Sequence, residues 1–404
     1  MFSFVPVGEC QLLVSPLRSS FFASLEHRAI LGVCRQYWHQ PLRATPIGRS
    51  KRLPYSTVRR LPQYRTMGPE AKPKAKIDYK IPRPSSSVIL ISPKNEVLLL
   101  HRVKTSSSFP SAHVFPGGTI SPQDGDFPPA GHPDSHDEGI HYRRAAIREL
   151  FEESGILLAK NSITGQMIRV NPAEREKGRH AIHMNETTFD QWLKGQDTAA
   201  VADTDPLVPF SHWITPQRNP RRFTTQMYLY FLPHSNGGIS DIAGDTEVQV
   251  PSTDGGIEIT EAQFLPATEW LRRARVGDII MFPPQVLLLD FVAQFLDKPG
   301  LNGTSPQSIS GEESTKRRAE LVKFAHSGNP PWTHKFISPH PIGNVPDGRQ
   351  ILDLSQPGPE LKGTDKKGEI DRVVLARFNK EGPREVEIRW RRDVLPNGPA
   401  KSSL

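Results

Sequence analysis

The chain has 404 residues, and its 51 lysines and arginines outnumber its 43 aspartates and glutamates. The excess positive charge lies in residues 1–66, where Glu9 and Glu26 are the only acids, so residues 67–404 are neutral and give no reason to expect nucleic-acid binding. No apolar run approaches the roughly 18 residues of a membrane span. Both cysteines, Cys10 and Cys34, also lie in the basic segment. A disulfide framework, a cysteine zinc site and a catalytic thiol are therefore excluded for the rest of the chain.

The basic segment 1–66 has the composition of a mitochondrial transit peptide. It is rich in Arg and Ser, and residues 22–33 can present an apolar stripe along a helix. We therefore predict import into the mitochondrial matrix; a disordered basic tail, or upstream sequence before a start at Met67, is the alternative. The last three residues, Ser-Ser-Leu at 402–404, differ by one substitution from the peroxisomal Ser-Lys-Leu signal, so peroxisomal import is the alternative location. Residues 67–84, rich in Pro and Lys, are expected to form a linker.

The first folded elements are expected to be strands. Two apolar runs at 87–91 and 97–100 flank a Pro-Lys-Asn-Glu stretch, which predicts a β-hairpin. A further strand is expected to end at Phe115 and to meet a tight turn at Pro116-Gly117-Gly118. Residues 121–140, made largely of Pro, Gly, Asp and His, are predicted to be a surface loop.

A helix is predicted to follow this loop, from about His141 to Ser154, with Gly155 as its C-terminal cap. Its core-facing residues are expected to be Ala145, Ala146, Leu150 and Phe151.

The remaining elements alternate between helix and strand. Residues 161–205 are predicted to be an excursion with a helix near 188–193. Strands are predicted at 223–232 and 257–265, and helices at 268–275 and 285–295. Residues 299–331, rich in Gly, Ser and Pro, are expected to be a linker, and residues 332–404 a β-rich C-terminal extension with a hairpin formed by 373–378 and 385–390.

The predicted helix carries a cluster of acids. Glu149, Glu152 and Glu153 are spaced i, i+3 and i+4, so they project from one face and repel one another unless a cation lies among them. Carboxylate oxygens suit Mg²⁺ or Mn²⁺, which can bridge the oxygens of a pyrophosphate and hold a water for attack. Arg148 is expected on another face of the helix, where it can pair with an acid and hold the preceding loop.

The two glycines before the helix complete the pattern. Gly117 and Gly118 allow the backbone to approach the helix closely, and the Gly118 carbonyl is a further candidate metal ligand. Arg148 through Ile156 read Arg-Glu-apolar-Xaa-Glu-Glu-Xaa-Gly-apolar, so this segment resembles the Nudix box. The resemblance implies an α/β/α sandwich with a mixed β-sheet over about residues 85–298, and metal-dependent hydrolysis of nucleoside diphosphates linked to another moiety. Glu149, Glu152 and Glu153 would then be the metal ligands, and Glu149 or an acid from a distant loop the base.

The box is split by an insertion. Its first Glu is expected six residues after Gly118, where Asp124 stands, and 23 residues rather than seven separate Asp124 from Arg148. A split box of this kind resembles the coenzyme A diphosphatase branch of the family, as do the later Trp213-Ile-Thr-Pro216, Arg222-Phe-Thr-Thr225 and Pro283-Pro-Gln285. A separate coenzyme A signature would place Arg at 107 and Gly at 111, where serines stand.

Substrate contacts are predicted just before the strand at 223–232. Arg218, Arg221 and Arg222 are candidates for binding substrate phosphates, and Glu258 and Glu261 for bringing an acid to the metal. Coenzyme A or an acyl-coenzyme A is the expected small-molecule partner. NADH, ADP-ribose or oxidised nucleotides are the alternative substrates, and a non-catalytic Nudix-fold scaffold is the alternative from another class. A zinc site at His132, His136 and His141 is disfavoured by its spacing.

Overall fold

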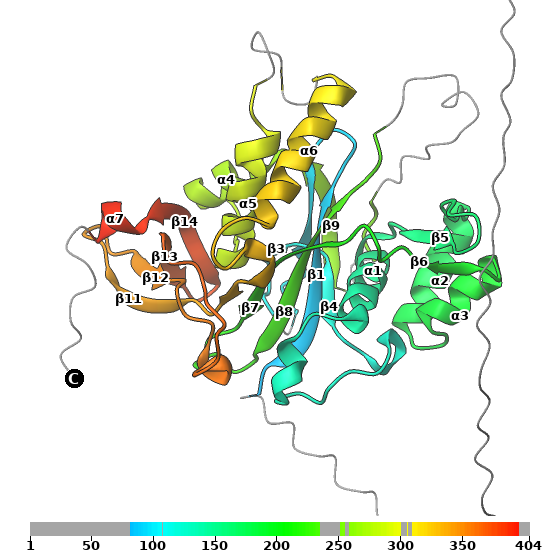
Figure 1. Ribbon diagram of the computed structural model, residues 1–404, viewed down its shortest axis with the longest axis horizontal. Helices are drawn as coiled ribbons and strands as arrows, with labels where there is room; N and C mark the ends of the chain where they lie inside the picture. Colours follow the sequence, from blue (N-terminus) through cyan, green and yellow to red (C-terminus); the bar gives the residue numbers. More distant parts are fainter. Residues whose placement is uncertain are drawn as a thin grey trace, which may run out of the picture. The chain divides into compact units, whose positions relative to one another are not determined.

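The computed structural model describes residues 81–106, 108–234, 251–254, 258–299, 305 and 309–395. These belong to one compact unit that spans Lys74–Leu404 (Figure 1). The predicted transit peptide 1–66, most of the predicted linker 67–84 and the C-terminal tripeptide lie outside the described residues, so they stay predictions. Within the described ranges, no helix combines the length and the apolar character needed to cross a membrane.

An eight-stranded mixed sheet forms the centre of this unit. Its strands are β1 (Arg83–Ile91), β2 (Val97–Arg102), β3 (His113–Val114), β4 (Gly117–Thr119), β7 (Val208–Ile214), β8 (Phe223–Phe231), β9 (Ile259–Leu265) and β10 (Phe336–Ile337). Six of them lie in the order β10, β7, β8, β1, β2, β3, while β4 pairs with β1 and β9 with β2. β1 and β8 run parallel over nine residue pairs, whereas β7–β8 and β1–β2 are antiparallel. The predicted hairpin of the first two strands is confirmed.

Both faces of the central strand β1 are buried. Val88 and Leu90 point into one hydrophobic core, and Ile89 and Ile91 point into another on the opposite face. A strand that is covered on both faces has a continuous run of apolar residues instead of alternating apolar and polar ones. Residues 88–91 form such a run.

Helices cover the sheet on each side (Figure 1). The helix α1 (Ile140–Ser154) packs on the face of Val88 and Leu90. The helices α4 (Ala267–Val276) and α5 (Pro283–Leu296) pack on the other face. The predicted α/β/α sandwich is therefore confirmed.

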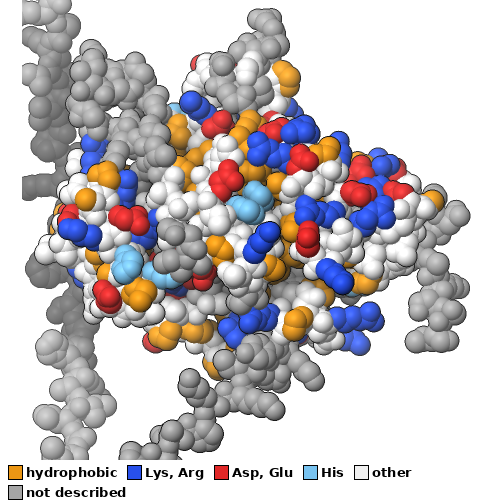
Figure 2. All heavy atoms as spheres, turned by 180° about the vertical axis from the view of Figure 1, so that it is seen from behind, with side chains coloured by type: hydrophobic (Ala, Val, Ile, Leu, Met, Phe, Trp, Pro, Cys, Tyr) orange, Lys and Arg blue, Asp and Glu red, His pale blue; other side chains and the backbone are white. Residues whose placement is uncertain are grey.

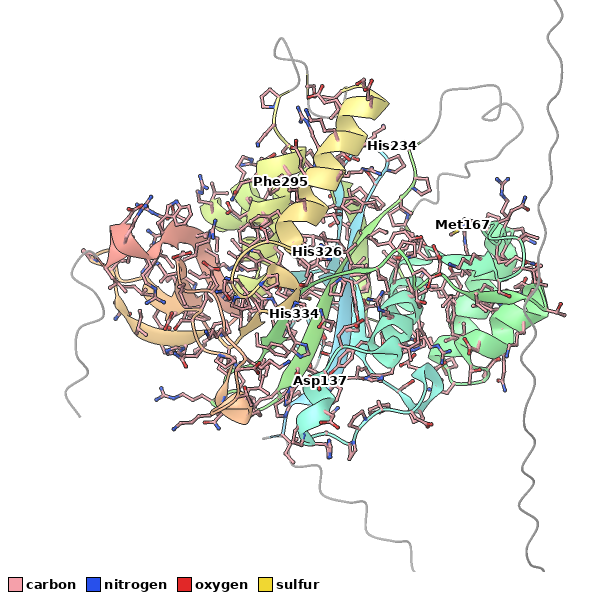
Figure 3. The ribbon with its side chains drawn as sticks, in the orientation of Figure 1. Asp137, Met167, His234, Phe295, His326 and His334 are labelled. Atoms are coloured by element: carbon pink, nitrogen blue, oxygen red, sulfur yellow. The ribbon has the colours of Figure 1, made fainter. Side chains whose placement is uncertain are left out.

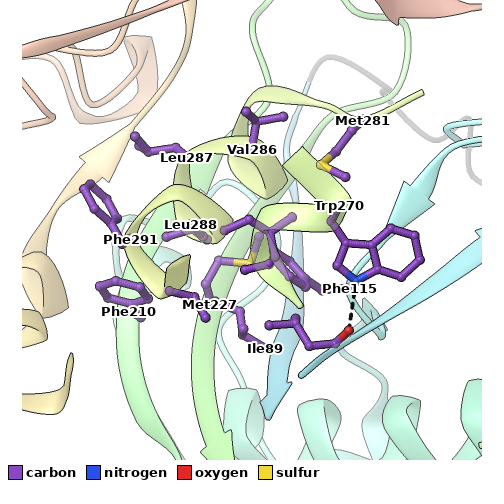
Figure 4. Close-up of a cluster of buried hydrophobic side chains, with 14 of the residues drawn as sticks. Ile89, Phe115, Phe210, Met227, Trp270, Met281, Val286, Leu287, Leu288 and Phe291 are labelled. Carbon is purple, nitrogen blue, oxygen red and sulfur yellow. Dashed lines mark hydrogen bonds between the residues drawn. The ribbon is translucent and has the colours of Figure 1, made fainter. Parts of the chain in front are cut away.

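The core beneath α4 and α5 is anchored by a tryptophan (Figure 4). Trp270 packs among Ile89, Phe115 and Met281, and its indole N–H donates a 3.0 Å hydrogen bond to the carbonyl of Val97 in β2. Because the indole nitrogen finds a partner, the ring can be almost wholly buried without leaving a polar atom unsatisfied.

The segment after α1 contains more structure than its sequence predicts. It holds β5 (Ala159–Asn161), α2 (Pro172–His183), α3 (Phe189–Gln196) and β6 (Ala200–Ala202). Only α3 is predicted, because α2 has few apolar residues and buries Gly178, Arg179 and Ile182. A Cβ on Gly178 would lie 2.1 Å from the ring of Trp192, so this glycine permits close packing of the two helices.

The predicted surface loop 121–140 is partly buried. It contains two short 3-10 helices, η1 (Pro122–Asp124) and η2 (Pro133–His136). His136 is 3% exposed, and its Nδ1 lies 2.8 Å from the Thr224 hydroxyl, which also lies 2.6 Å from Nε2 of the buried His212. The prediction of a surface loop is wrong at this end, because the loop's polar side chains have polar partners in the core rather than water.

The predicted linker 299–331 contains a packed helix, α6 (Gly311–Ala325), so that part of the domain prediction is wrong. The helix is held by apolar and polar contacts together. Leu321 and Ala325 are fully buried in the core that α5 shares. Arg318 donates to the carbonyls of Ser92 and Leu232 at 2.7 Å each, and Ser310 caps the first turn through the N–H of Glu313.

The C-terminal extension forms a second, antiparallel sheet, as predicted. Its strands are β11 (His340–Asn344), β12 (Gln350–Asp353), β13 (Arg372–Asn379) and β14 (Gly382–Trp390), in that order. Short helices η6 (Trp332–His334), η7 (Pro359–Leu361) and α7 (Arg391–Val394) accompany them. Leu352, Val374 and Val386 share one hydrophobic core with α4 and α5, so this sheet packs on the sandwich.

The outer surface of this second sheet carries both signs of charge. Figure 2 shows its basic and acidic side chains interspersed, and several form ion pairs, such as Arg349 with Glu387 at 3.0 Å and Arg377 with Glu385 at 3.1 Å. Charges arranged in this way largely neutralise one another.

Candidate active site

The acids of the box lie on the helix that the sequence predicts. α1 ends at Ser154, and Gly155 follows with a positive φ of 71°, in the left-handed conformation that closes a helix. Its predicted core residues, from Ala145 to Phe151, are fully buried against the sheet. The opposite face presents Glu149, Glu152 and Glu153 to a large cavity.

Arg148 pairs with the loop that precedes the insertion. Its Nε and Nη2 donate to the two carboxylate oxygens of Asp124 at 2.8 Å each, and both side chains are less than 5% exposed. Nη2 also donates to the carbonyl of Thr119 at 3.0 Å. Asp124 therefore occupies the position of the first acid of the box, and the inserted residues follow it.

The same guanidinium contacts the acids of its own helix. Nη1 of Arg148 lies 2.8 Å from one oxygen of Glu149 and 2.8 Å from one oxygen of Glu152. The predicted pairing of Arg148 with an acid of the preceding loop is confirmed, but its guanidinium does not lie on a face apart from Glu149 and Glu152. One buried cation thus orients two of the three carboxylates and fixes the loop before the helix.

Glu153 is held by the two elements next to the helix. The N–H of Gly117 donates to one of its oxygens at 2.9 Å, and Arg102 of β2 donates to the other at 3.2 Å. A Cβ on Gly117 would lie 2.3 Å from the carbonyl oxygen of Ser86, so only glycine allows this backbone to pass between β1 and the helix. Burial raises the pKa of Glu153 well above its usual range, against the opposing effect of Arg102.

Glu149 faces the second glycine. A Cβ on Gly118 would lie 2.4 Å from the carboxylate of Glu149, so the glycine leaves the space that this carboxylate occupies. Burial also raises the pKa of Glu149, although Arg148 lowers it. A carboxylate whose pKa is raised toward neutrality is suited to accepting a proton.

An arginine that the sequence does not single out closes the end of α1. Arg179 of α2 is 2% exposed, and it donates to the carbonyls of Glu152 and Glu153 at 2.6 and 2.7 Å. It also donates to the carbonyl of Thr253 at 2.8 Å. These carbonyls would otherwise be unsatisfied at the helix terminus. Arg179 thereby connects the backbone of two box acids to residues 251–254.

Glu258 and Glu261, the two acids predicted to approach the metal from outside the helix, lie in different positions. Glu258 lines the cavity and pairs with Arg102 at 2.9 Å, so one guanidinium joins it to Glu153. Its backbone N–H is held by Asp254, another cavity residue, at 2.7 Å. Glu261 is exposed on β9 and is not among the residues that line the cavity. Glu258 is therefore the better candidate of the predicted pair, and Asp254 is an acid that the sequence does not indicate.

The cavity has a volume of about 1620 Å³ and joins the box to residues far away in the chain. The three secondary motifs contribute Trp213–Pro216 at the end of β7, Arg222, Phe223 and Thr225 at the start of β8, and Pro283–Gln285 at the start of α5. Residues 356–359, 361–364 and 366 complete the wall, together with Phe378, Gly382 and Pro383 beside the turn of the β13–β14 hairpin.

The three predicted phosphate-binding arginines have different environments. Arg218 and Arg221 are exposed residues of the loop between β7 and β8, and both line the cavity. Arg222 is 3% exposed, pairs with Glu360 at 2.5 Å and donates to the carbonyl of Thr215 at 2.8 Å. Arg222 also lines the cavity, so its contact with substrate stays a prediction, while its ion pair with Glu360 gives it a structural role as well.

The donor set fits a hard divalent cation. Carboxylate oxygens from Glu149, Glu152 and Glu153 face one cavity, and such oxygens are the ligands that Mg²⁺ and Mn²⁺ prefer. Among the described residues, no three acids or histidines converge in a metal-binding arrangement. Arg148 pairs with Glu152, and Arg102 pairs with Glu153, so cations of the protein engage both carboxylates.

Comparisons with known proteins agree with this site. Residues 81–234 match the family model for the NUDIX domain. The chain is 30% identical over 216 residues to "Putative nudix hydrolase 7" of Caenorhabditis elegans, a match that covers 53% of this chain and 62% of the relative. It is 27% identical over 244 residues to "Acyl-coenzyme A diphosphatase NUDT19" of Xenopus laevis, covering 50% of this chain and 60% of that protein.

The chain thus spans about three-fifths of the length of these curated relatives. Among solved structures, a NUDIX hydrolase from Alicyclobacillus acidocaldarius is similar, with a TM-score of 0.42 and 20% identity over 53% of this chain and 91% of that chain. The resemblance to the Nudix family and to its acyl-coenzyme A diphosphatase branch, predicted from the box and the secondary motifs, is confirmed.

Proposed function

We propose, from the premise that residues 81–234 form a Nudix domain, that this chain hydrolyses the diphosphate bond of a nucleoside diphosphate linked to another moiety. We propose further that the substrate is coenzyme A or an acyl-coenzyme A. The observation that carries the proposal is the complete set of box acids on one face of α1, held by Arg148, Asp124 and Gly117 at the edge of a large cavity.

Glu149, Glu152 and Glu153 would hold Mg²⁺ or Mn²⁺, which when bound offsets the negative charge of the diphosphate. The protein's own groups have separate tasks. Gly117 orients Glu153 through its N–H, and Arg148 orients Glu149 and Glu152. Glu149 is the favoured proton acceptor for the attacking water, because its carboxylate faces the cavity beside Gly118. Glu258 is the alternative acceptor from the distant loop.

Three observations support coenzyme A as the substrate. The three secondary motifs that resemble the coenzyme A diphosphatase branch line the same cavity as the box, although they lie up to about 70 residues apart in the chain. The cavity is also larger than the roughly 300–1,000 Å³ of a site for a drug-sized ligand. A relative from Xenopus laevis is named for acyl-coenzyme A diphosphatase activity.

A product assay tests the proposal. The full chain is incubated with Mg²⁺ or Mn²⁺ and with coenzyme A, acetyl-coenzyme A, NADH, ADP-ribose or 8-oxo-dGTP, and the products are identified by mass spectrometry. The expected products from coenzyme A are adenosine 3′,5′-bisphosphate and phosphopantetheine. Glu153→Gln is expected to lower kcat by about 10²–10³-fold. Glu312→Gln, on an exposed residue of α6 outside the cavity, is the matched control.

The outcomes separate the alternatives. Cleavage of another nucleotide alone keeps the bond type and removes coenzyme A as the substrate. A folded, metal-loaded chain that cuts none of these compounds contradicts the hydrolase proposal and favours a scaffold.

A further inference from the structure

The cavity has walls of opposite charge. One wall, here called the acidic wall, consists of Glu149, Glu152 and Glu153 on α1 together with Asp254 and Glu258. The other, here called the basic wall, consists of Arg218 and Arg221 on the β7–β8 loop and Lys362 just after η7. The three cations of the basic wall make no ion pair within the described part of the chain.

The β7–β8 loop that carries the two arginines is firmly closed. Thr215 and Phe223 exchange hydrogen bonds, with the Thr215 N–H donating to the Phe223 carbonyl at 2.9 Å and the Phe223 N–H donating to the Thr215 hydroxyl at 3.0 Å. Within the loop, the Asn219 N–H donates to the Pro216 carbonyl at 3.1 Å. Arg218 and Arg221 are therefore presented from a defined turn rather than from a free segment.

Buried Arg222 joins the two segments of the basic wall. Its ion pair with Glu360 of η7 connects the loop directly to the segment that carries Lys362. That segment is attached further along by Lys366, whose Nζ lies 3.5 Å from Asp137 (labelled in Figure 3). Both segments of the basic wall are thus tied to the sandwich at fixed points.

The acidic wall and the basic wall suit different parts of one ligand. A diphosphate needs a cation between itself and the acids, whereas a phosphate monoester can pair directly with guanidinium and ammonium groups. The arginines of the acidic side, Arg102 and Arg148, are already engaged with carboxylates. A second phosphate on the substrate would therefore find its partners on the basic wall.

We propose that Arg218, Arg221 and Lys362 form a second anion subsite, which binds a phosphate monoester that the substrate carries in addition to its diphosphate. This rests on the proposed function, and it narrows the substrate class to phosphorylated nucleotides such as those with a 3′-phosphoadenosine group. The subsite selects the substrate by affinity, whereas the acidic wall carries the reaction.

A binding experiment tests the subsite without requiring turnover. Calorimetry compares adenosine 3′,5′-bisphosphate with adenosine 5′-monophosphate, which differ only in the second phosphate. The full chain is expected to bind the bisphosphate about tenfold more tightly, as one charge-assisted contact of about 1.4 kcal/mol would give. The double variant Arg218→Ala/Arg221→Ala is expected to lose this preference. Arg272→Ala, which removes an exposed arginine of α4 outside the cavity, is expected to keep it.

A kinetic comparison then connects the subsite to the reaction. Coenzyme A and dephospho-coenzyme A differ only in the 3′-phosphate, and the double variant is expected to raise KM for coenzyme A about tenfold, to the value for dephospho-coenzyme A. Added salt is expected to weaken the preference for coenzyme A, because the subsite is exposed.

Equal affinities for the two adenosine phosphates, or a preference that survives in the double variant, overturn the subsite. A preference that persists while neither coenzyme is cut supports the subsite and contradicts the proposed function, so the two failures can be told apart. Thermal melting of each variant checks that the chain is folded.

Discussion

The acidic wall of the cavity is held by a dense group of buried charges, whereas the basic wall is held by single ion pairs between distant parts of the chain. Arg148 makes three ion pairs, with Asp124 and two glutamates, all within 25 residues of itself. Arg222 makes its ion pair with Glu360, 138 residues away. A rigid group suits reacting atoms, which need fixed geometry, and a wall supplied by two loops can change its ligand without disturbing them.

The largest expected effect comes from breaking the acidic wall at Arg148. Arg148→Ala leaves the buried Asp124 without its ion-pair partner, and a buried charge that loses such a partner costs about 3–5 kcal/mol. We expect a loss of this size in the free energy of unfolding, measured by urea denaturation, and no detectable hydrolysis. The exposed Arg272→Ala should change stability by less than about 0.5 kcal/mol. A similar small change at Arg148 would mean that Asp124 and Arg148 do not hold the loop.

The next largest effect is expected from displacing one carboxylate of the acidic wall, that of Glu149. Gly118→Ala places a methyl group 2.4 Å from the Glu149 carboxylate, which must turn away. We expect kcat to fall about 100-fold, as for a displacement of about 1 Å at a reacting group, while KM changes little. Gly195→Ala on α3 is the control, because its Cβ meets no atom within 4 Å. Unchanged kcat for Gly118→Ala would remove Glu149 from the reaction.

Disrupting the basic wall at Arg222 should lower the free energy of unfolding by less than the change at Arg148. It should also act on KM rather than on kcat. Arg222→Ala removes the partner of Glu360, which is 17% exposed and can be partly hydrated, so we expect a loss of about 2 kcal/mol, below that for a fully buried pair. KM for coenzyme A should rise, because Arg218, Arg221 and Lys362 lose their common anchor. A double-mutant cycle with Glu360→Gln measures the coupling. Additive effects on stability would show that the pair does not join the two segments.

The same contrast explains how far the sequence predicts the site. The acids of α1 and the cap at Gly155 follow from local spacing, because helix geometry relates residues three and four apart. Asp124 is indicated by its distance of six residues from Gly118. Arg179 and Arg222 have no such signature. Their roles depend on carbonyls and carboxylates that only the tertiary fold brings near, so one is missed and the other is predicted as a substrate contact.

The secondary-structure elements also separate into those that the sequence predicts and those that it does not. Strands and helices with apolar periodicity, such as β8 and α5, are predicted nearly in full. The helices α2 and α6 are missed, because few apolar residues of each reach the core and buried arginines supply much of the remaining attachment. Composition alone therefore assigns residues 299–331 to a linker.

The smallest expected effect concerns the buried polar contacts that join the inserted loop to β8. Burial lowers the pKa of His212 to about 3, so the folded protein keeps this histidine neutral, whereas the unfolded chain binds a proton near the ordinary pKa of 6.5. His212 therefore contributes stability above about pH 6.5 that is lost progressively as the pH falls toward 3. Between pH 7 and pH 5.5 the loss should be about 1 kcal/mol. His136, whose pKa is also lowered mainly by burial, adds a loss of the same sign.

Urea denaturation at the two pH values, on the full chain and on His212→Gln, measures this contribution. The glutamine retains polar atoms for Thr224 and Gln226 but does not titrate, so its stability should fall less between pH 7 and pH 5.5 than that of the unaltered chain. The comparison is made between the two proteins, because the raised pKa values of Glu149 and Glu153 favour folding at low pH in both of them and cancel in the difference. Parallel profiles of stability against pH for the two proteins would mean that His212 titrates alike in the folded and unfolded chain. The surroundings of His212 next to β8 would then be open to water.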